Sequence, residues 1–227
     1  MSDNNLFINI KHFQDIANIF EYPLNDFNKG VNDVQTLLND KYPDAGAELV
    51  SFTQYANNTA LDQKQEIYTR TFDVQAITTM DCGYLIFGDD YKRGELLSNL
   101  NREHINSNNE LYNQMADHIP NLLRLLPKLN DKELAEDLVS QIIKPALRKI
   151  TGEFDPERIK RKNELYKKHH QTLIESSEDY SGVYVYAFKA LRIVLGYHFT
   201  DKEAELPESS SDFLKSISSE IELEHSK

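Results

Sequence analysis

Asp117 and His118 are adjacent in the segment Asp117-His118-Ile119-Pro120, and their side chains are of types that can do chemistry. A carboxylate next to an imidazole can transfer protons, bind a metal ion or hold a basic ligand. A second segment has two cations directly after a turn and runs Gly88-Asp89-Asp90-Tyr91-Lys92-Arg93-Gly94. A third segment combines two aromatic residues with a carboxylate and runs Tyr68-Thr69-Arg70-Thr71-Phe72-Asp73. Packing alone does not call for these residues, so we expect function to reside in these segments.

The signatures of common catalytic sites are missing from the sequence. It has no glycine-rich phosphate loop, no nucleophile elbow and no paired-cysteine or His-Glu-x-x-His zinc spacing. His169 and His170 point about 100° apart on a helix, so we interpret them as surface histidines. Cys82 lies in an apolar stretch, which favours a buried thiol. We therefore predict no catalytic residues, no cofactor and no metal ion. Two alternatives remain, a metal-dependent helical enzyme using Asp117 and His118, and a helical adaptor.

Charge and hydropathy exclude several classes of partner. The net charge of -12 argues against nucleic-acid binding, which needs clustered lysine and arginine. Residues 148–168 carry a net charge of +4, which leaves -16 for the rest, and we interpret this basic stretch as a solvated helix face. No stretch approaches the roughly 20 apolar residues that span a bilayer, so we predict no membrane insertion. The start of the chain lacks the features of a secretory signal, which favours a cytoplasmic location.

Apolar residues recur at helical spacing along most of the chain, which predicts an all-α, single-domain bundle of about eight to ten helices. The helical domain covers 1–199, and 200–227 is predicted to be an acidic, serine-rich tail. Tyr22-Pro23 and Tyr42-Pro43 should end helices, since proline disfavours helical backbone before it. The predicted helices lie in 7–20, 27–38, 49–56, from near Thr59 to Phe72, in 74–87, 96–105, 120–129, 132–150, after the turn at 152–156, and in 180–199.

The helix ends give more specific expectations. Thr59, Asp89 or Asp90, and Asp131 are predicted to be N-caps, and Pro145 should kink or split its helix. Gly94 would permit a close approach of helices. These predictions concern packing only.

The charged residues of the three segments need partners. Asp73 could pair with Arg70, three residues earlier. Lys92 and Arg93 oppose the dipole of the helix they begin, so each needs a carboxylate or solvent. If Asp117 caps the following helix, Pro120 offers no N–H, and one carboxylate oxygen is left for Arg93 or for a basic ligand.

Taken together, these segments resemble the TorD/DmsD/NarJ family of molybdoenzyme-specific chaperones, and most closely the NarJ-like branch that assembles nitrate reductase. The resemblance covers about the first 130 residues, in the same order and spacing. It is carried by Glu21-Tyr22-Pro23, Tyr68-x-x-x-Phe72-Asp73, Gly88-Asp89-x-x-Lys92-Arg93-Gly94 and Asp117-His118-Ile119-Pro120-x-Leu122-Leu123.

The resemblance implies an all-helical, non-catalytic chaperone. Such a protein binds the N-terminal region or twin-arginine leader of the catalytic subunit of a molybdopterin-containing oxidoreductase until the molybdenum cofactor is loaded. An acidic protein with an aromatic groove suits a basic, apolar peptide of this kind. The peptide-binding residues predicted on this basis are Tyr68, Phe72, Asp73, Lys92, Arg93, Asp117, His118 and Pro120.

Overall fold

The structure, a computed structural model, describes residues 10–170 and 182–200, and over these residues it is all-α, as predicted. The only β-type pairing in the described residues is an isolated bridge between Asp81 and His118. A 3-10 turn covers Leu126–Lys128 and a π-helix covers Leu138–Ile143. The α-helices are α2 (Phe13–Asn18), α3 (Phe27–Lys41), α4 (Pro43–Asn58), α5 (Leu61–Phe72), α6 (Cys82–Phe87), α7 (Tyr91–Asn106), α8 (Ile119–Leu125), α9 (Lys132–Asp137), α10 (Lys144–Glu153), α11 (Pro156–His170) and α12 (Tyr184–His198).

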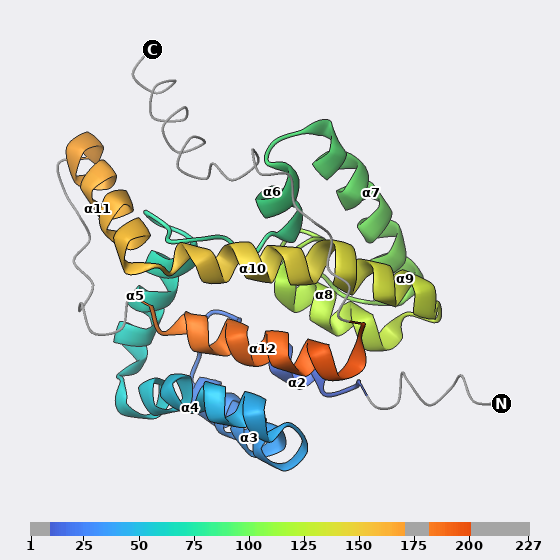
Figure 1. The fold of residues 1–227 in the computed structure, drawn as a ribbon, viewed down its shortest axis with the longest axis horizontal. Helices are drawn as coiled ribbons and strands as arrows, with labels where there is room; N and C mark the ends of the chain where they lie inside the picture. The colour runs from blue at the N-terminus through green and yellow to red at the C-terminus, as the bar shows by residue number, and fades with distance from the viewer. Residues whose placement is uncertain (1–9, 171–181, 201–227) are drawn as a thin grey trace.

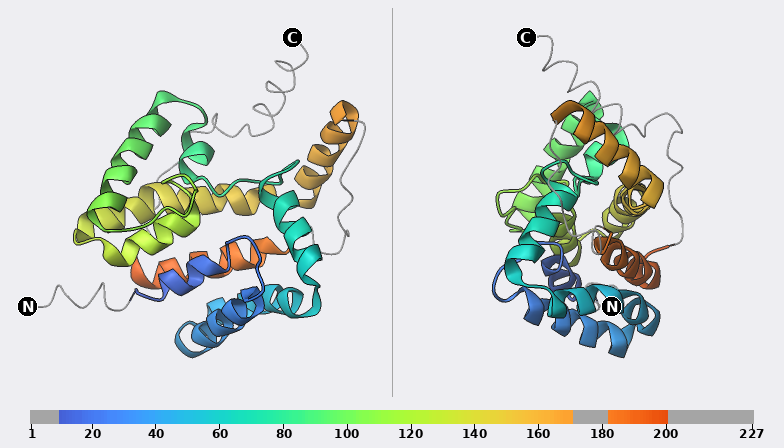
Figure 2. Two further views of the ribbon diagram at one scale, coloured as in Figure 1. Left: turned by 180° about the vertical axis from the view of Figure 1, so that it is seen from behind. Right: turned by 90° about the vertical axis from the view of Figure 1, so that its left-hand side faces the viewer.

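Helix α12 forms the centre of the bundle, because it packs against α4 on one side and α10 on the other (Figure 1). The hairpin of α3 and α4 covers one face, and α2 runs between this hairpin and α8 (Figure 2). Tyr42-Pro43 separates α3 from α4, as the sequence predicted. The core between these layers contains packed aromatic rings among its aliphatic residues, and Phe20 stacks on Phe188 with 4.8 Å between ring centroids.

The predicted helix over 74–87 is wrong for its first half, because only Cys82–Phe87 is helical. The backbone of residues 76–78, just before this helix, makes hydrogen bonds to α11 and α5 instead. Lys162 of α11 donates to the carbonyl of Ile77, Tyr166 donates to that of Ala76 at 3.4 Å, and the N–H of Thr78 donates to the carbonyl of Thr71. The apolar pattern of this stretch therefore reflects burial and not helix.

The predicted helix ends are partly confirmed. Asp90 caps α7 by accepting from the N–H of Lys92, and Asp131 caps α9 by accepting from two N–H groups. Thr59 is not an N-cap: it ends α4, and Ala60 precedes α5 without a side-chain cap. Gly94 has open space around it, so the close approach falls at another glycine.

Pro145 was predicted to kink or split its helix; the chain stays helical there, but the type of helix changes. The π-helix Leu138–Ile143 precedes it, and α10 begins with the proline in its first turn. Proline has no N–H to continue the regular helical bonding, so the chain changes its bonding pattern there.

The basic stretch is a solvated face only in part. Lys160 and Arg161 are exposed, but Lys162 is 1% exposed and pairs with Glu153 at 2.7 Å. Burial lowers the pKa of Lys162, while Glu153 opposes this shift.

No helix in the described ranges has the length and apolar character needed to cross a membrane. The predicted tail lies, apart from Thr200, outside the described residues.

Candidate functional site

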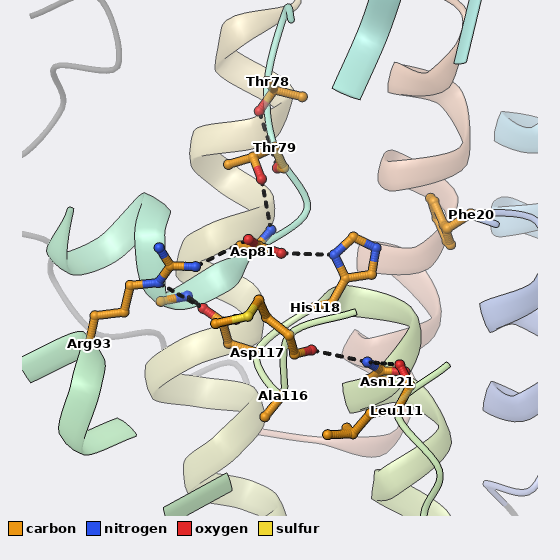
Figure 3. A network of polar contacts seen from close by, with 12 residues as sticks. Phe20, Thr78, Thr79, Asp81, Arg93, Leu111, Ala116, Asp117, His118 and Asn121 are labelled. Carbon is orange, nitrogen blue, oxygen red and sulfur yellow. Dashed lines mark hydrogen bonds and ion pairs between the residues drawn. The ribbon is translucent and has the colours of Figure 1, made fainter. Parts of the chain in front are cut away.

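The segments before α6 and α8 lie antiparallel and fix the site. The N–H of Cys82 donates to the carbonyl of Asp117, and the N–H of Ile119 donates to the carbonyl of Met80, both at 3.0 Å. Asp81 and His118 therefore stand opposite each other in an isolated bridge. Their side chains meet, with Asp81 Oδ1 2.8 Å from His118 Nδ1 (Figure 3).

This contact fixes the tautomer of neutral His118. A carboxylate only accepts hydrogen bonds, so Nδ1 carries the proton and Nε2 keeps its lone pair. Nε2 is buried and has no hydrogen-bond partner within the described part of the chain. The imidazole points toward Phe20 (Figure 3), and His118 is 6% exposed. In its neutral form, His118 therefore presents a buried and unpaired acceptor on the side that faces Phe20.

Arg93 joins the two acidic residues of the site. Its Nη2 donates to Asp81 Oδ2 at 3.1 Å and its Nε donates to Asp117 Oδ2 at 3.4 Å, while its guanidinium lies 5.2 Å from the ring centroid of Tyr84. The expectation that Arg93 needs a carboxylate partner is confirmed. Lys92, on the same turn of α7, is exposed.

Asp117 does not cap α8, because His118 occupies that position. Its Oδ2 instead accepts from the N–H of Gly83 at 3.0 Å and so caps α6 across the chain. Arg93 is one partner of this carboxylate, whereas its Oδ1 is buried and has no hydrogen-bond partner among the described residues. Burial raises the pKa of Asp117, and so does the charge of Asp81, whereas Arg93 and the Gly83 N–H lower it.

Gly83 is required by this arrangement. A Cβ on this residue would lie 2.7 Å from Asp117 Oδ2 and 3.0 Å from a methyl carbon of Leu96. Both distances are shorter than ordinary van der Waals contact. Glycine at this position therefore lets α6, α7 and the Asp117 segment approach closely.

The aromatic residues of α5 form a second cluster. The rings of Tyr68 and Phe72 lie 5.0 Å apart, and Tyr68 also packs edge-on against Tyr22 at 5.4 Å. The hydroxyl of Tyr68 donates to the carbonyl of Phe20 at 3.3 Å. Burial raises the pKa of Tyr68, and the charges of Glu21 and Asp73 raise it further.

The predicted pair of Arg70 and Asp73 does not form. Arg70 donates to the carbonyl of Gln75 at 2.9 Å and to Asn163 Oδ1 at 3.1 Å. Asp73 follows the last residue of α5 and is exposed. Arg70 therefore connects α5 to α11 through a hydrogen bond.

The predicted site residues thus fall into two groups, one on α5 and one around Arg93, Asp117 and His118. Tyr68, Asp117, His118 and Pro120 are buried, and Phe72 is partly buried. The exposed members are Asp73 and Lys92. Most of the predicted site residues are therefore packed inside the protein, and Asp73 and Lys92 lie at its surface.

Asp81 is the residue that sequence reasoning missed, although it contacts both Arg93 and His118. It is the lone carboxylate within the apolar stretch 74–87. A charge in such a stretch needs a partner when it is buried, and this was the available signal.

Within the described residues, no group of three or more His, Cys, Asp and Glu side chains is placed to hold one. Cys82 is fully buried, and its pKa is raised by burial and by the charges of Asp117 and Asp81. Its thiol is therefore protonated and inert.

Comparison of the chain with protein-family models, with curated proteins and with solved structures found nothing similar. The resemblance to molybdoenzyme chaperones therefore rests on the four segments identified in the sequence.

Proposed function

We propose that this protein is a cytoplasmic, non-catalytic chaperone. It binds the N-terminal or leader region of the catalytic subunit of a molybdoenzyme and holds that subunit while the molybdenum cofactor is inserted. The proposal starts from the four segments that resemble the TorD/DmsD/NarJ family. The helical architecture of the described residues agrees with it.

The observation that carries the proposal is that these four segments contact one another in two pairs. Tyr22 of the first segment contacts Tyr68 of the second, and Arg93 of the third contacts Asp117 of the fourth. Segments far apart in the chain thus form pairwise contacts, as they would if they built one site.

Buried and exposed residues of the site have different roles in this proposal. Asp117 and His118 are buried and paired, so they position α6 and α8 and reach a client only if the segments around them open. Asp73, Lys92 and Tyr22 are exposed at the edge, where a client can make first contact.

The charge of the whole chain suits a basic client. A net charge of -12 attracts a positively charged leader over long distances and speeds association. The entropy lost when the peptide becomes ordered offsets part of the favourable contact energy. We therefore expect a dissociation constant of about 1 µM, which corresponds to a binding free energy of about -8 kcal/mol. Such an affinity allows release once the cofactor is in place.

The test uses the N-terminal peptides of molybdoenzyme catalytic subunits from the organism that encodes this chain. We expect one of them to bind in a fluorescence anisotropy titration, and the same peptide with its arginines and lysines changed to glutamine to bind more weakly. If no such peptide binds, or if the catalytic subunit acquires its molybdenum equally well in cells that lack this chain, the proposal is wrong.

The double variant Asp117→Asn with His118→Ala tests the role of the buried pair. We expect weaker peptide binding with retained helicity, because asparagine can still accept from the Gly83 N–H. Circular dichroism and the same titration provide the measurements. Unchanged affinity would restrict the binding surface to the exposed residues.

A further inference from the structure

A pocket lies where the second half of α4 faces the end of α10 and the start of α12, away from the charged site. Its volume is about 480 Å³, and none of the predicted site residues lines it. Pockets of about 300–1,000 Å³ are typical of ligand sites. Its polar lining comes from Ser51, Gln54 and Asn58, and its apolar lining includes Phe154, Val183 and Val185.

The lining is uncharged, since no described residue around the pocket is acidic, basic or histidine. A charged group entering it would lose water without gaining a counter-ion, whereas an apolar group would leave water favourably. The pocket therefore favours an uncharged group that has both apolar and hydrogen-bonding surface, although the chain as a whole is strongly acidic.

Two amide side chains at the pocket are open to new hydrogen bonds. Gln54 and Asn58 are exposed and lie one turn apart on the same face of α4. Neither side chain makes a hydrogen bond to another described residue. A carboxamide both donates and accepts, which matches the N–H and C=O of a peptide backbone.

A chain of contacts between aromatic rings connects the pocket lining to the aromatic cluster of α5. Tyr55, which lines the pocket, has its ring 6.4 Å from that of Tyr184. Tyr184 in turn lies 4.9 Å from Phe72 and 6.0 Å from Tyr68. The predicted aromatic site residues thus lie behind the pocket wall.

We propose that this pocket binds a bulky apolar side chain from an uncharged stretch of another polypeptide. Phe154, Val183 and Val185 hold the side chain, and the amides of Gln54 and Asn58 bind the neighbouring backbone. The identity of that polypeptide as the client rests on the proposed function, and the chemistry of the pocket does not.

The first test uses N-acetyl-leucine N-methylamide as the probe on the full chain, followed by the methyl NMR signals of Val183 and Val185. We expect saturable shifts at millimolar concentrations. The corresponding lysine and glutamate derivatives should give no saturable shifts. Equal shifts with all three, or none with the leucine derivative, would overturn the proposal.

Blocking the pocket gives the matched variant. Ser51→Trp fills the pocket from the exposed face of α4, and we expect it to abolish the shifts. Ser98→Trp places the same side chain on the exposed face of α7, outside the pocket lining, and should bind the probe like the unchanged chain. Loss of binding in both variants, or in neither, would contradict the assignment.

The role of the two amides is tested by Gln54→Leu combined with Asn58→Leu. This variant keeps the pocket apolar and removes both hydrogen-bonding groups. We expect affinity for the probe to fall by about fivefold for each lost hydrogen bond. Unchanged or tighter binding would show that the amides do not recognise the backbone.

A client peptide that passes the anisotropy titration separates this inference from the proposed function. If it binds the unchanged chain and not Ser51→Trp, the pocket is where the client docks. If it binds both equally, the pocket is not the docking site, although the chaperone function stands. If the leucine probe binds but no client peptide does, the chaperone function fails and the pocket remains a site for another polypeptide.

Discussion

Arg93 is the side chain on which the charged site depends most. Asp117 is 0% exposed and shares its Oδ2 between Arg93 and the Gly83 N–H, so removal of the guanidinium leaves a buried charge without a counter-ion. Asp81 would keep only His118. The cost of breaking a buried ion pair exceeds what the pair itself contributes, because desolvation of the remaining ion is not compensated.

We therefore expect Arg93→Gln to lower the free energy of unfolding by about 3 kcal/mol near neutral pH, measured by urea denaturation. Adding Asp117→Asn should recover part of this loss, because the amide carries no charge. Lys92→Gln, on the exposed side of the same turn, is the control and should change stability by less than about 0.5 kcal/mol.

The same variant has a defined pH dependence. Burial already raises the pKa of Asp117 above the ordinary 3.8, and loss of Arg93 removes an interaction that lowers it. A raised folded-state pKa gives stability that is present at low pH and lost as the pH rises through that pKa. The cost of Arg93→Gln should therefore shrink as the pH falls, and a constant cost would contradict this account.

Gly83 shows which glycine the packing needs. Gly83→Ala would place a Cβ 2.7 Å from Asp117 Oδ2, so we expect a loss of about 1–3 kcal/mol in the free energy of unfolding. Gly94→Ala is the matched control within α7. It has no atom within 4 Å of the new Cβ and should gain about 0.5–1 kcal/mol from helix propensity. Thermal unfolding of both variants measures the difference, and equal effects would rule out the close approach.

At the scale of elements, the sequence predicted helices well where the local signal decides. Tyr42-Pro43 ends α3, Asp131 caps α9 and Pro145 follows the π-helix, all through backbone chemistry that acts within a few residues. The irregular stretch before α6 was not predictable in this way. Its conformation is set by α11, which lies far along the chain, and by the bridge between Asp81 and His118.

The site follows the same division. The need of Arg93 for a carboxylate could be read from its place at the start of a helix, since the helix dipole disfavours a cation there. Its two partners lie 12 and 24 positions away in the chain, and no local pattern specifies them. The pocket between α4 and α12 had no sequence signal either, because its lining residues are ordinary ones brought together by packing.

Lys162 is the contact through which α11 holds this stretch. We expect Lys162→Met to increase hydrogen exchange in 74–80 and to lower the free energy of unfolding by about 1–3 kcal/mol, because the Ile77 carbonyl loses its charged donor. Glu153 keeps Arg158 at 2.8 Å, which limits the cost. Lys160→Met, two residues earlier and exposed, is the control. Exchange that rises equally in both variants would show that α11 does not hold the stretch.

At the scale of the whole molecule, one buried hydroxyl joins elements from both ends of the described chain. Tyr42 Oη lies 2.6 Å from His198 Nε2 at the end of α12 and 3.2 Å from His12 Nε2, just before α2. A hydroxyl has one proton, so it donates to one imidazole and accepts from the other. The two imidazole rings are 5.1 Å apart, which disfavours a charge on both.

This arrangement makes stability depend on pH in a predictable direction. Burial lowers the pKa of His198 below its ordinary 6.5, so the unfolded chain takes up a proton that the folded chain resists. The stability contribution is present above pH 6.5 and is lost as the pH falls through that value, by at most about 1.4 kcal/mol per pH unit for one proton. His198→Gln keeps a hydrogen-bonding group for Tyr42 and cannot titrate. Urea unfolding between about pH 7 and pH 5 should therefore show a smaller loss in the free energy of unfolding for the variant than for the unchanged chain. Equal losses in the two proteins would show that protonation of His198 does not control this pH dependence.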